Sequence, residues 1–572
     1  SISNLIKSTD PQNYAMIIDS TITNEDMYLS KKFGSEVVGS NNIISNADID
    51  SGLRHKLTET LGFSSASNTI QDLKNSKSYL VVSSNITENH NILSLPIKQS
   101  IDSGKSKLVV IDQRETEITK FASLWLNPYP GTEAYLIGGI IRSIIDQSLE
   151  NKDFVENYSQ NYADFRKSIW KFDLIKVSSI TGISVEDINE AVNILANGPM
   201  ATIYSNETIK PHNLDELVKL LIDLSLVTGN IGQKGGGIYP MFRGSNSQGA
   251  TDLGLTTVVN NPSNLDITDN RDISYNKILE MIKNNQIKVL HLVGDFHEDY
   301  NDDLFEIINN VKDNMKIISH KSLSSSNRDE VSDYIMPSTT FAESEGTKTN
   351  IERRIQLLNI AIKPKYDQTQ IYKSMQNLSK YFGSKKFQYN KIDSVFAEIS
   401  DFIPMYKNIN YKFIKKNRNI TWPISENNKN NILYSMKSNA INEKFNFKIS
   451  DLDESMFGRN GSYLALGRVL NKSKFSISHK SKEQSNFKQM YNLSMHPDDA
   501  TKHQLKQNQI IKLIPENSDP IDCIVITNGK TKDVFAITTL FGNMIQTLDE
   551  TKSDLKYYLV PNLDVVSVQI KK

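Results

Sequence analysis

Short apolar runs alternate with amphipathic stretches over the first two thirds of the chain. The short apolar runs are followed by stretches with apolar positions at helical spacing, such as residues 24–33 and 134–149. Repeated alternation of strand, polar loop and helix predicts parallel, doubly wound α/β sheets. Ligands of such sheets bind beyond the carboxyl ends of the strands, which here read SSNITE, DQRE, GDFHE and HKS. The predicted strands are 14–18 (YAMII), 79–82 (YLVV), 108–111 (LVVI), 289–293 (VLHLV) and 316–319 (KIIS).

The last third has a different pattern. Residues 384–454 are rich in Lys, Asn and Tyr and weakly periodic, which indicates a long connecting segment over the surface. From residue 455 onward, short apolar runs such as IIKLIP, DCIVIT and VFAITTLF are separated by polar turns. This second pattern predicts a compact β-barrel domain that closes the chain.

Length and charge narrow the classes of protein. A chain of 572 residues is too long for one hydrophobic core, so we expect several domains. The formal net charge of −1 gives no general attraction to nucleic acid. The sequence contains no apolar run of about 18 residues, so it predicts no membrane-spanning helix. The single cysteine, Cys523, excludes a disulfide framework and a cysteine-ligated iron–sulfur cluster within this sequence. We expect Cys523 to be a core residue of a strand.

The strongest local signal is the glycine-rich segment 228–254, TGNIGQKGGGIYPMFRGSNSQGATDLG. A helical pattern ends at Gly229, and the glycines that follow let the backbone approach a ligand closely. Arg243 stands among these glycines although only 12 of the 65 basic residues are Arg, which indicates a need for a planar, bidentate donor. Asn246 and Gln248 add polar side chains suited to reading a ligand.

This segment resembles the pattern TGNIG-x-x-GGG-x-x-P-x-RGQNN-x-QGA-x-DMG of molybdopterin-dependent formate dehydrogenases. Three further stretches resemble the same family in the same order: YLVVSSNITENHNI, LVVIDQRETE with PYPGTEAYL, and YIMPSTTFAESEGTKTNIERRIQ. The chain thus resembles the molybdopterin oxidoreductases of the dimethyl sulfoxide reductase family. Within that family it is most similar to formate dehydrogenase catalytic subunits and to the large iron–sulfur subunit of respiratory complex I.

The resemblance implies a fold and a cofactor. The expected fold has two Rossmann-like α/β domains around a cofactor cleft, residues 1–45 with 246–383 and residues 46–245, followed by a double-psi β-barrel over 455–572. The implied cofactor is bis-molybdopterin guanine dinucleotide with Mo or W. The resemblance gives Arg243 a catalytic role. The positions it assigns to cofactor contacts are Asn85, Glu88, Asp112, Arg114, Gly131, Thr132, Gly244, Asn246, Gln248, Gly294 and Arg468.

Some of these positions have a structural alternative. Asp112 follows a strand end and is suited to accept hydrogen bonds from guanine N–H groups or ribose hydroxyls; the alternative is a carboxylate that caps a helix. Glu88 follows another strand end and is suited to contact a polar ligand; the alternative is a carboxylate that stabilises the start of a helix. We expect Asn85, Asp112 and Gly294 to lie at the carboxyl ends of parallel strands and to face one cleft, with Arg243 directed into it.

The chain departs from the family at the metal. The family carries a Cys or selenocysteine ligand followed by His, but the matching stretch here reads NADIDSGLRHKL. Spacing places the ligand position at Asp50 or Ser51, which offer hard oxygen ligands; the alternative is a loop without metal contact. The family's [4Fe–4S] cluster is expected only in an N-terminal region that this sequence does not include.

These observations leave alternative functions open. The first is a formate-dehydrogenase-like oxidoreductase subunit in electron transfer, either active with Mo or W, formate as substrate and an oxygen ligand to the metal, or catalytically degenerate because the Cys–His pair is missing. The second is a non-catalytic scaffold subunit of a complex I type NADH–quinone oxidoreductase, and the third is a structural interaction module. Expected partners are iron–sulfur or NADH-oxidising electron-transfer subunits, with formate as substrate of an active form. We expect a cytoplasmic location, peripheral to the inner membrane through a respiratory complex.

Overall fold

The protein is described here by a computed structural model. It describes residues 1–207, 211–258, 273–296, 298–322, 331–364, 366–424, 432–433, 444–452, 462–466, 491–513, 521–529, 532, 534–539 and 557–560. The chain forms two compact units: unit 1 comprises Ser1–Ser65 and Phe242–Asn431, and unit 2 comprises Ala66–Met241 and Ile432–Lys572. The chain leaves unit 1 after Ser65 and returns after Met241, where the sequence had suggested boundaries after residues 45 and 245.

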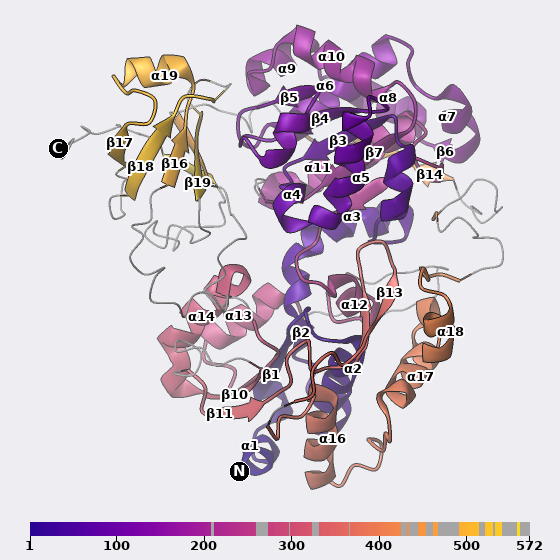
Figure 1. Ribbon diagram of the computed structural model, residues 1–572, viewed down its shortest axis with the longest axis vertical. Helices are drawn as coiled ribbons and strands as arrows, with labels where there is room; N and C mark the ends of the chain where they lie inside the picture. Colours follow the sequence, from indigo (N-terminus) through magenta and orange to yellow (C-terminus); the bar gives the residue numbers. More distant parts are fainter. Residues whose placement is uncertain are drawn as a thin grey trace. The chain divides into compact units, whose positions relative to one another are not determined.

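The centre of unit 1 is a five-stranded sheet in which every pairing is parallel, with the order β11-β10-β9-β1-β2 (Figure 1). In the register of its middle strands, Tyr14 lies opposite Val289 and Ile18 opposite Val293, so two distant parts of the sequence lie side by side. The strands are β1 (Tyr14–Ile18), β2 (Ile43–Ser45), β9 (Val289–Val293), β10 (Lys316–Lys321) and β11 (Tyr334–Pro337).

Helices cover both faces of this sheet. Alternate residues of β1 point to opposite faces: Ala15 and Ile17 join one apolar cluster, and Met16 and Ile18 join the other. The first face packs against α13 (Tyr275–Lys283) and α14 (Glu298–Val311), and the second against α2 (Asn24–Lys32) and α16 (Ile371–Tyr381). Burial on both sides explains why these strands read as continuous apolar runs. Unit 1 also contains α1 (Ile2–Lys7), α3 (Ser51–Leu61), α12 (Ser247–Asp252), β12 (Gly346–Thr349) and β13 (Ile355–Leu358).

Part of the segment 384–454, expected as a surface connection, is built into the core of unit 1. It contains α17 (Ile392–Phe402) and α18 (Tyr411–Lys416). Val395, Phe396 and Ile399 of α17 are buried against the second face of the sheet. Their spacing of one, three and four residues is that of an amphipathic helix, which the surrounding Lys and Asn residues obscure at the level of composition.

Unit 2 contains a second sheet of five parallel strands, with the order β5-β4-β3-β7-β8 (Figure 1). Helix α10 (Val185–Leu195) packs on β3, β4 and β5, and α6 (Glu133–Asp146) packs against α10 and α11 (Pro211–Val227). The strands are β3 (Ser78–Val82), β4 (Lys107–Ile111), β5 (Leu124–Leu126), β7 (Met200–Tyr204) and β8 (Ile238–Pro240). The other helices are α4 (Ile86–Asn89), α5 (Asn91–Asp102), α7 (Lys152–Tyr158), α8 (Tyr162–Ile169) and α9 (Leu174–Thr181).

The C-terminal strands form a separate, mixed sheet with the order β17-β18-β16-β19-β15-β20. The bounds are β15 (Ser462–Leu466), β16 (Tyr491–Ser494), α19 (Pro497–Lys502), β17 (Ile510–Leu513), β18 (Ile521–Ile526), β19 (Val534–Thr539) and β20 (Tyr557–Val560). Cys523 is buried in β18, as expected. The predicted α/β class with parallel sheets is confirmed, whereas the double-psi barrel stays a prediction. Among the described helices, none combines the length and apolar character needed to cross a membrane.

Candidate functional site

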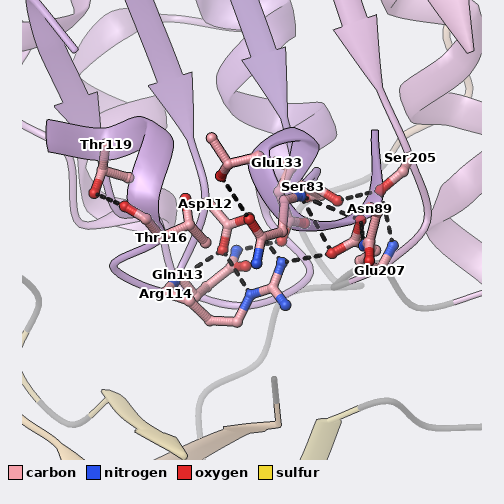
Figure 2. A network of polar contacts seen from close by, with 12 residues as sticks. Ser83, Asn89, Asp112, Gln113, Arg114, Thr116, Thr119, Glu133, Ser205 and Glu207 are labelled. Atoms are coloured by element: carbon pink, nitrogen blue, oxygen red, sulfur yellow. Dashed lines mark hydrogen bonds and ion pairs between the residues drawn. The ribbon is translucent and has the colours of Figure 1, made fainter. Parts of the chain in front are cut away.

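Three loops carry polar side chains at the carboxyl end of the sheet in unit 2. They follow the three central strands, β4, β3 and β7, and contain residues 112–114, 83–85 and 205–207 (Figure 2). Backbone hydrogen bonds continue past the strands: the Ser83 N–H donates to Ile111 O at 2.8 Å, and the Ser205 N–H donates to Val82 O at 3.2 Å. The loops therefore start from fixed positions, and their side chains converge where a doubly wound sheet binds its ligand.

Arg114 lies at the centre of this convergence. Its Nε donates to Asp112 Oδ1 and its Nη2 to Asp112 Oδ2, both at 3.1 Å, and Nη2 also donates to Glu207 Oε2 at 3.2 Å (Figure 2). The side chains of Arg114 and Asp112 are almost fully buried, so their pairing offsets the cost of removing two charges from water. With both carboxylates ionised, the three side chains carry a formal charge of −1.

Glu207 connects the loops that follow β3 and β7. Both of its carboxylate oxygens accept from the Asn85 backbone N–H, at 3.1 and 3.2 Å, and Oε1 also accepts from Asn89 Nδ2 at 2.6 Å. Together with Arg114, these donors surround the Glu207 carboxylate on the sheet side. Its side chain is 18% exposed, whereas that of Asp112 is 1% exposed, so Glu207 forms the solvent side of the cluster.

A second buried carboxylate, Glu133, lies beside this cluster. Its Oε1 accepts from Gln113 Nε2 and from the Gly131 backbone N–H, the latter at 3.2 Å. Burial raises the pKa of Glu133 to about 7, so near neutral pH a substantial fraction of this carboxyl is protonated and can donate a hydrogen bond. Gly131 has a φ of +87°, a left-handed conformation that favours glycine in the turn before α6. Thr132 closes the turn by donating from Oγ1 to Tyr129 O at 2.6 Å.

The same loops and the start of α6 carry buried polar atoms that fit a polar ligand. Ser83 Oγ, Ser84 Oγ, Thr116 Oγ1 and Glu133 Oε2 are shielded from solvent and have no hydrogen-bond partner among the residues that the structure describes. Unsatisfied buried polar atoms are costly, and several of them together are accounted for by a bound group that supplies the missing partners. Hydroxyl and carboxyl groups in this arrangement match the needs of a nucleotide.

The structure brings together most of the site residues that the sequence predicted in unit 2. Asn85, Asp112 and Arg114 share hydrogen-bond partners, and Gly131 contacts Glu133. Glu88 lies in α4, half-buried, where its backbone N–H donates to Asn85 O at 3.2 Å.

Arg243 and Asp50 form an ion pair in unit 1. The Arg243 side chain donates from Nε and Nη2 to Asp50 Oδ1, at 3.0 and 2.7 Å, and its backbone N–H donates to Asp50 Oδ2 at 2.7 Å. The Asp50 side chain is 2% exposed and that of Arg243 is 26% exposed. The candidate catalytic arginine and one of the two candidate metal ligands therefore satisfy each other. The other candidate ligand, Ser51, is the half-buried first residue of α3.

Two further polar residues of the glycine-rich segment, Asn246 and Gln248, contact residues of unit 1, whereas Asn230 lies in the part that belongs to unit 2 and accepts from the Met200 N–H at 2.8 Å. Asn246 donates to Ile22 O at 2.8 Å and accepts from the Thr349 N–H at 2.7 Å. Gln248 donates from Nε2 to Asp252 Oδ1 at 2.8 Å, and its Oε1 accepts from Arg54. These contacts fix the part of the segment that follows Met241 to unit 1. Gly244 allows the backbone to pack closely against Ser20. Its φ is +84°, and a Cβ there would lie 2.2 Å from Ser20 Oγ.

Two other candidates lie apart from the unit 2 cluster. Gly294 follows β9, at the carboxyl end of the sheet in unit 1, with a φ of +116°. We expected Gly294 to face the same cleft as Asn85 and Asp112. This expectation involves both units and stays a prediction. Arg468 lies outside the described residues. Within the described part of the chain, no group of three or more His, Cys, Asp or Glu side chains is placed to hold a metal ion.

Sequence reasoning did not identify Glu207, Gln113 or Asn89. Like the residues that were found, Glu207 lies in a polar stretch, SNE, that directly follows an apolar run, MATIY. Gln113 and Asn89 neighbour predicted residues, but only the folded backbone turns them toward Glu133 and Glu207.

Comparisons with known proteins identify the family of this chain. The F420-dependent formate dehydrogenase subunit alpha of Methanocaldococcus jannaschii is 28% identical, over 96% of this chain and 84% of that protein. The F420-dependent formate dehydrogenase 1 subunit alpha of Methanococcus maripaludis is 24% identical, over 100% of this chain and 88% of that protein. The acetylene hydratase from Pelobacter acetylenicus shares the fold, with a TM-score of 0.65 at 14% identity over 94% of this chain and 80% of that one. A model of the molybdopterin oxidoreductase family matches residues 1–381, more than half of the chain. The chain therefore belongs to the molybdopterin oxidoreductase family.

Proposed function

We propose that this chain is a formate-dehydrogenase-like subunit of an electron-transfer complex that binds a molybdopterin dinucleotide but does not itself oxidise formate. Membership of the family implies a molybdopterin cofactor with Mo or W. Formate dehydrogenase alpha subunits are among its relatives, which supports association with other electron-transfer subunits. The observation that carries the catalytic half of the proposal is the ion pair between Arg243 and Asp50.

This ion pair occupies the Asp50 carboxylate and the Arg243 guanidinium, the candidate metal ligand and the candidate catalytic group at the metal end of the site. The two Asp50 oxygens accept three hydrogen bonds from Arg243, at 2.7 to 3.0 Å, and the carboxylate is buried. Binding a metal through Asp50 would break this pairing and leave the guanidinium without its counter-charge. Conversely, an arginine already neutralised by Asp50 attracts a formate anion weakly. The residues present therefore do not fit the metal end.

The dinucleotide end fits better. The residues that would hold it are Asp112, Gln113 and Glu133, together with the unsatisfied hydroxyls of Ser83 and Ser84. We propose the guanine form because Glu133 Oε2, buried and without a described partner, accepts from N–H groups of the kind that guanine carries when the carboxyl is ionised.

We also propose that the C-terminal strands close into the double-psi barrel that the resemblance implies. Strand β15 pairs parallel with β19 and antiparallel with β20, a mixture that a simple antiparallel meander lacks. This mixed pairing supports the barrel, although several of the connections between the strands, among them residues 467–490 and 540–556, lie outside the described residues.

The second candidate function is a scaffold subunit of a complex I type NADH–quinone oxidoreductase, with no cofactor at all. The same ion pair favours it, because a scaffold has no need of a free substrate arginine. The content of bound pterin separates the two candidates.

The test is to produce the chain in a host that supplies molybdenum and molybdopterin dinucleotide, with an active formate dehydrogenase prepared in parallel as the control. Bound pterin and metal are quantified, and formate-dependent reduction of an artificial dye is measured. We expect stoichiometric pterin without dye reduction. Dye reduction that depends on formate would contradict the proposal, and a chain that stays free of pterin would favour the scaffold.

A further inference from the structure

We propose that the Glu207 carboxylate occupies the position of a dinucleotide phosphate and has to withdraw before the dinucleotide binds at the carboxyl end of the sheet in unit 2. The inference rests on the proposed function, because it takes the dinucleotide as the ligand. It goes further by assigning Glu207, which the sequence did not single out, as an internal competitor that controls access to the site.

The donors around Glu207 are of the kind that a phosphate needs. They are a guanidinium nitrogen of Arg114, the backbone N–H of Asn85 and the side-chain amide of Asn89, all between 2.6 and 3.2 Å from the carboxylate oxygens (Figure 2). Arginine, loop N–H groups and amides are the usual ligands of phosphate oxygens in proteins. Glu207 is thus an anion held by an anion-binding arrangement of this chain's own residues.

Charge makes the carboxylate and a phosphate mutually exclusive. Asp112 already pairs with Arg114 through two hydrogen bonds, so Glu207 is the second anion around a single guanidinium. A phosphate would be a third anion in a buried cluster, where like charges repel strongly because solvent screening is weak.

Glu207 is also the member of the cluster that can leave. Its side chain is 18% exposed, while those of Asp112 and Arg114 are 1% and 2% exposed. Glu207 lies beyond the end of β7. Among the contacts described, its backbone N–H donates only to the neighbouring Ser205 Oγ, at 3.2 Å. Rotation toward solvent would free the Asn85 and Asn89 donors without disturbing the pair formed by Asp112 and Arg114.

The test uses the full chain purified from a host that makes no molybdopterin, so that the site carries no dinucleotide. Binding of GDP, inorganic pyrophosphate and guanosine is measured by calorimetry for the wild type, Glu207→Gln, Glu207→Asp and the control Glu190→Gln. Glu190 is an exposed residue of α10, so its variant makes the same change of charge away from the cluster. Glu207→Gln keeps an oxygen to accept from Asn85 and Asn89, and a thermal melt verifies folding.

We expect Glu207→Gln to bind GDP and pyrophosphate at least about tenfold more tightly than the wild type, a change of about 1.4 kcal/mol. Glu207→Asp, which keeps the charge but shortens the side chain, should gain less. Guanosine affinity should not change, because guanosine has no phosphate. Glu190→Gln should behave like the wild type.

Two results would overturn the inference. One is GDP affinity that is equal or weaker in Glu207→Gln, which would give Glu207 a purely structural or ligand-holding role while the proposed function stands. The other is the absence of GDP and pyrophosphate binding in every variant. The proposed function is judged independently, by the pterin content of chain produced with the cofactor, so its failure is distinguishable from failure of the inference.

Discussion

At the scale of single residues, Arg243 shows what a sequence can and cannot reveal. Its place among glycines in a lysine-rich chain indicated a specific need for a guanidinium, and in the structure two guanidinium nitrogens donate to the same oxygen of Asp50. The partner, Asp50, lies 193 positions away, and spacing alone had suggested it as a metal ligand. Pairings across such a separation follow from the fold, so the sequence pattern identified both residues but not their contact.

The ion pair predicts an asymmetry between two variants. In Arg243→Gln, the buried Asp50 carboxylate loses the charge of the guanidinium and its two side-chain hydrogen bonds and keeps the backbone N–H of residue 243, so we expect a loss of about 3 kcal/mol in the free energy of unfolding. In Asp50→Asn, the arginine left behind is 26% exposed and partly solvated, so the loss should be near 1 kcal/mol, of the order of one hydrogen bond.

Urea unfolding of both variants and of the double variant measures this asymmetry and the coupling between the two residues. Equal losses in the two single variants would contradict the asymmetry, and additive losses in the double variant would show that the pair contributes no specific interaction.

Gly244 predicts a steric effect that can be separated from backbone strain. Gly244→Ala combines a left-handed φ of +84° with a Cβ placed 2.2 Å from Ser20 Oγ. Gly383→Ala, also in unit 1, has a φ of +73° but nothing within 4 Å of the added Cβ. We expect Gly383→Ala to lower the unfolding free energy by about 1 kcal/mol and Gly244→Ala by about 2–3 kcal/mol. Thermal unfolding of the two variants tests the order, and similar losses would show that Ser20 moves aside freely.

At the scale of helices and strands, apolar runs were reliable where burial is two-sided. β1 and β9 have the bounds that the sequence predicted, because helices cover both faces of the sheet. β7 was missed although all five of its residues are buried, and the strands β2, β5 and β8 were not predicted, since three residues are too few to show a period. Their existence depends on a longer parallel neighbour that supplies the hydrogen bonds.

Two neighbouring strands of unit 1 contain a buried histidine pair. His291 of β9 and His320 of β10 stack with ring centroids 4.9 Å apart, and His291 Nδ1 contacts the Tyr14 hydroxyl at 2.7 Å. Burial lowers the pKa of both, that of His320 to about 4. Because the folded pKa lies below the unfolded value of about 6.5, the stabilisation is complete above pH 6.5 and is lost as the pH falls toward 4. The shift of His320 alone corresponds to at most about 3 kcal/mol.

The pair therefore predicts acid sensitivity of unit 1. Between about pH 7 and about pH 5, the urea midpoint of His320→Leu should fall less than that of the wild type. Buried carboxylates with raised pKa values, such as Glu25 at about 7, act in the opposite direction, so the difference between wild type and variant isolates the histidine effect. His55→Leu, at an exposed position of α3, serves as the control. Parallel pH profiles for wild type and His320→Leu would contradict the prediction.

At the scale of the whole molecule, the sequence indicated the α/β class directly, but the discontinuity of unit 1 came only through the family resemblance. Nothing in the apolar run at residues 14–18 states that its neighbour lies at residues 289–293. The boundary after Ser65 was also missed, because α3 belongs to unit 1 through contacts such as that of Arg54 with Gln248, which a linear pattern does not contain.

That discontinuity has a consequence for the order of events during synthesis. All five strands of the parallel sheet in unit 2 lie between residues 78 and 240, so this sheet can assemble while the ribosome is still translating. β1 emerges earlier but pairs with β9, and the core around it includes residues as late as Trp422. At roughly 5–20 residues per second, β1 waits on the order of 15–50 seconds for β9. Ribosome-stalled chains ending near residue 280 should resist protease over the unit 2 sheet and be cut near residues 14–18; protection of both would contradict this order. β1 thus leaves the exit tunnel well before the residues that cover it, and YAMII is a segment for which a nascent-chain chaperone would matter.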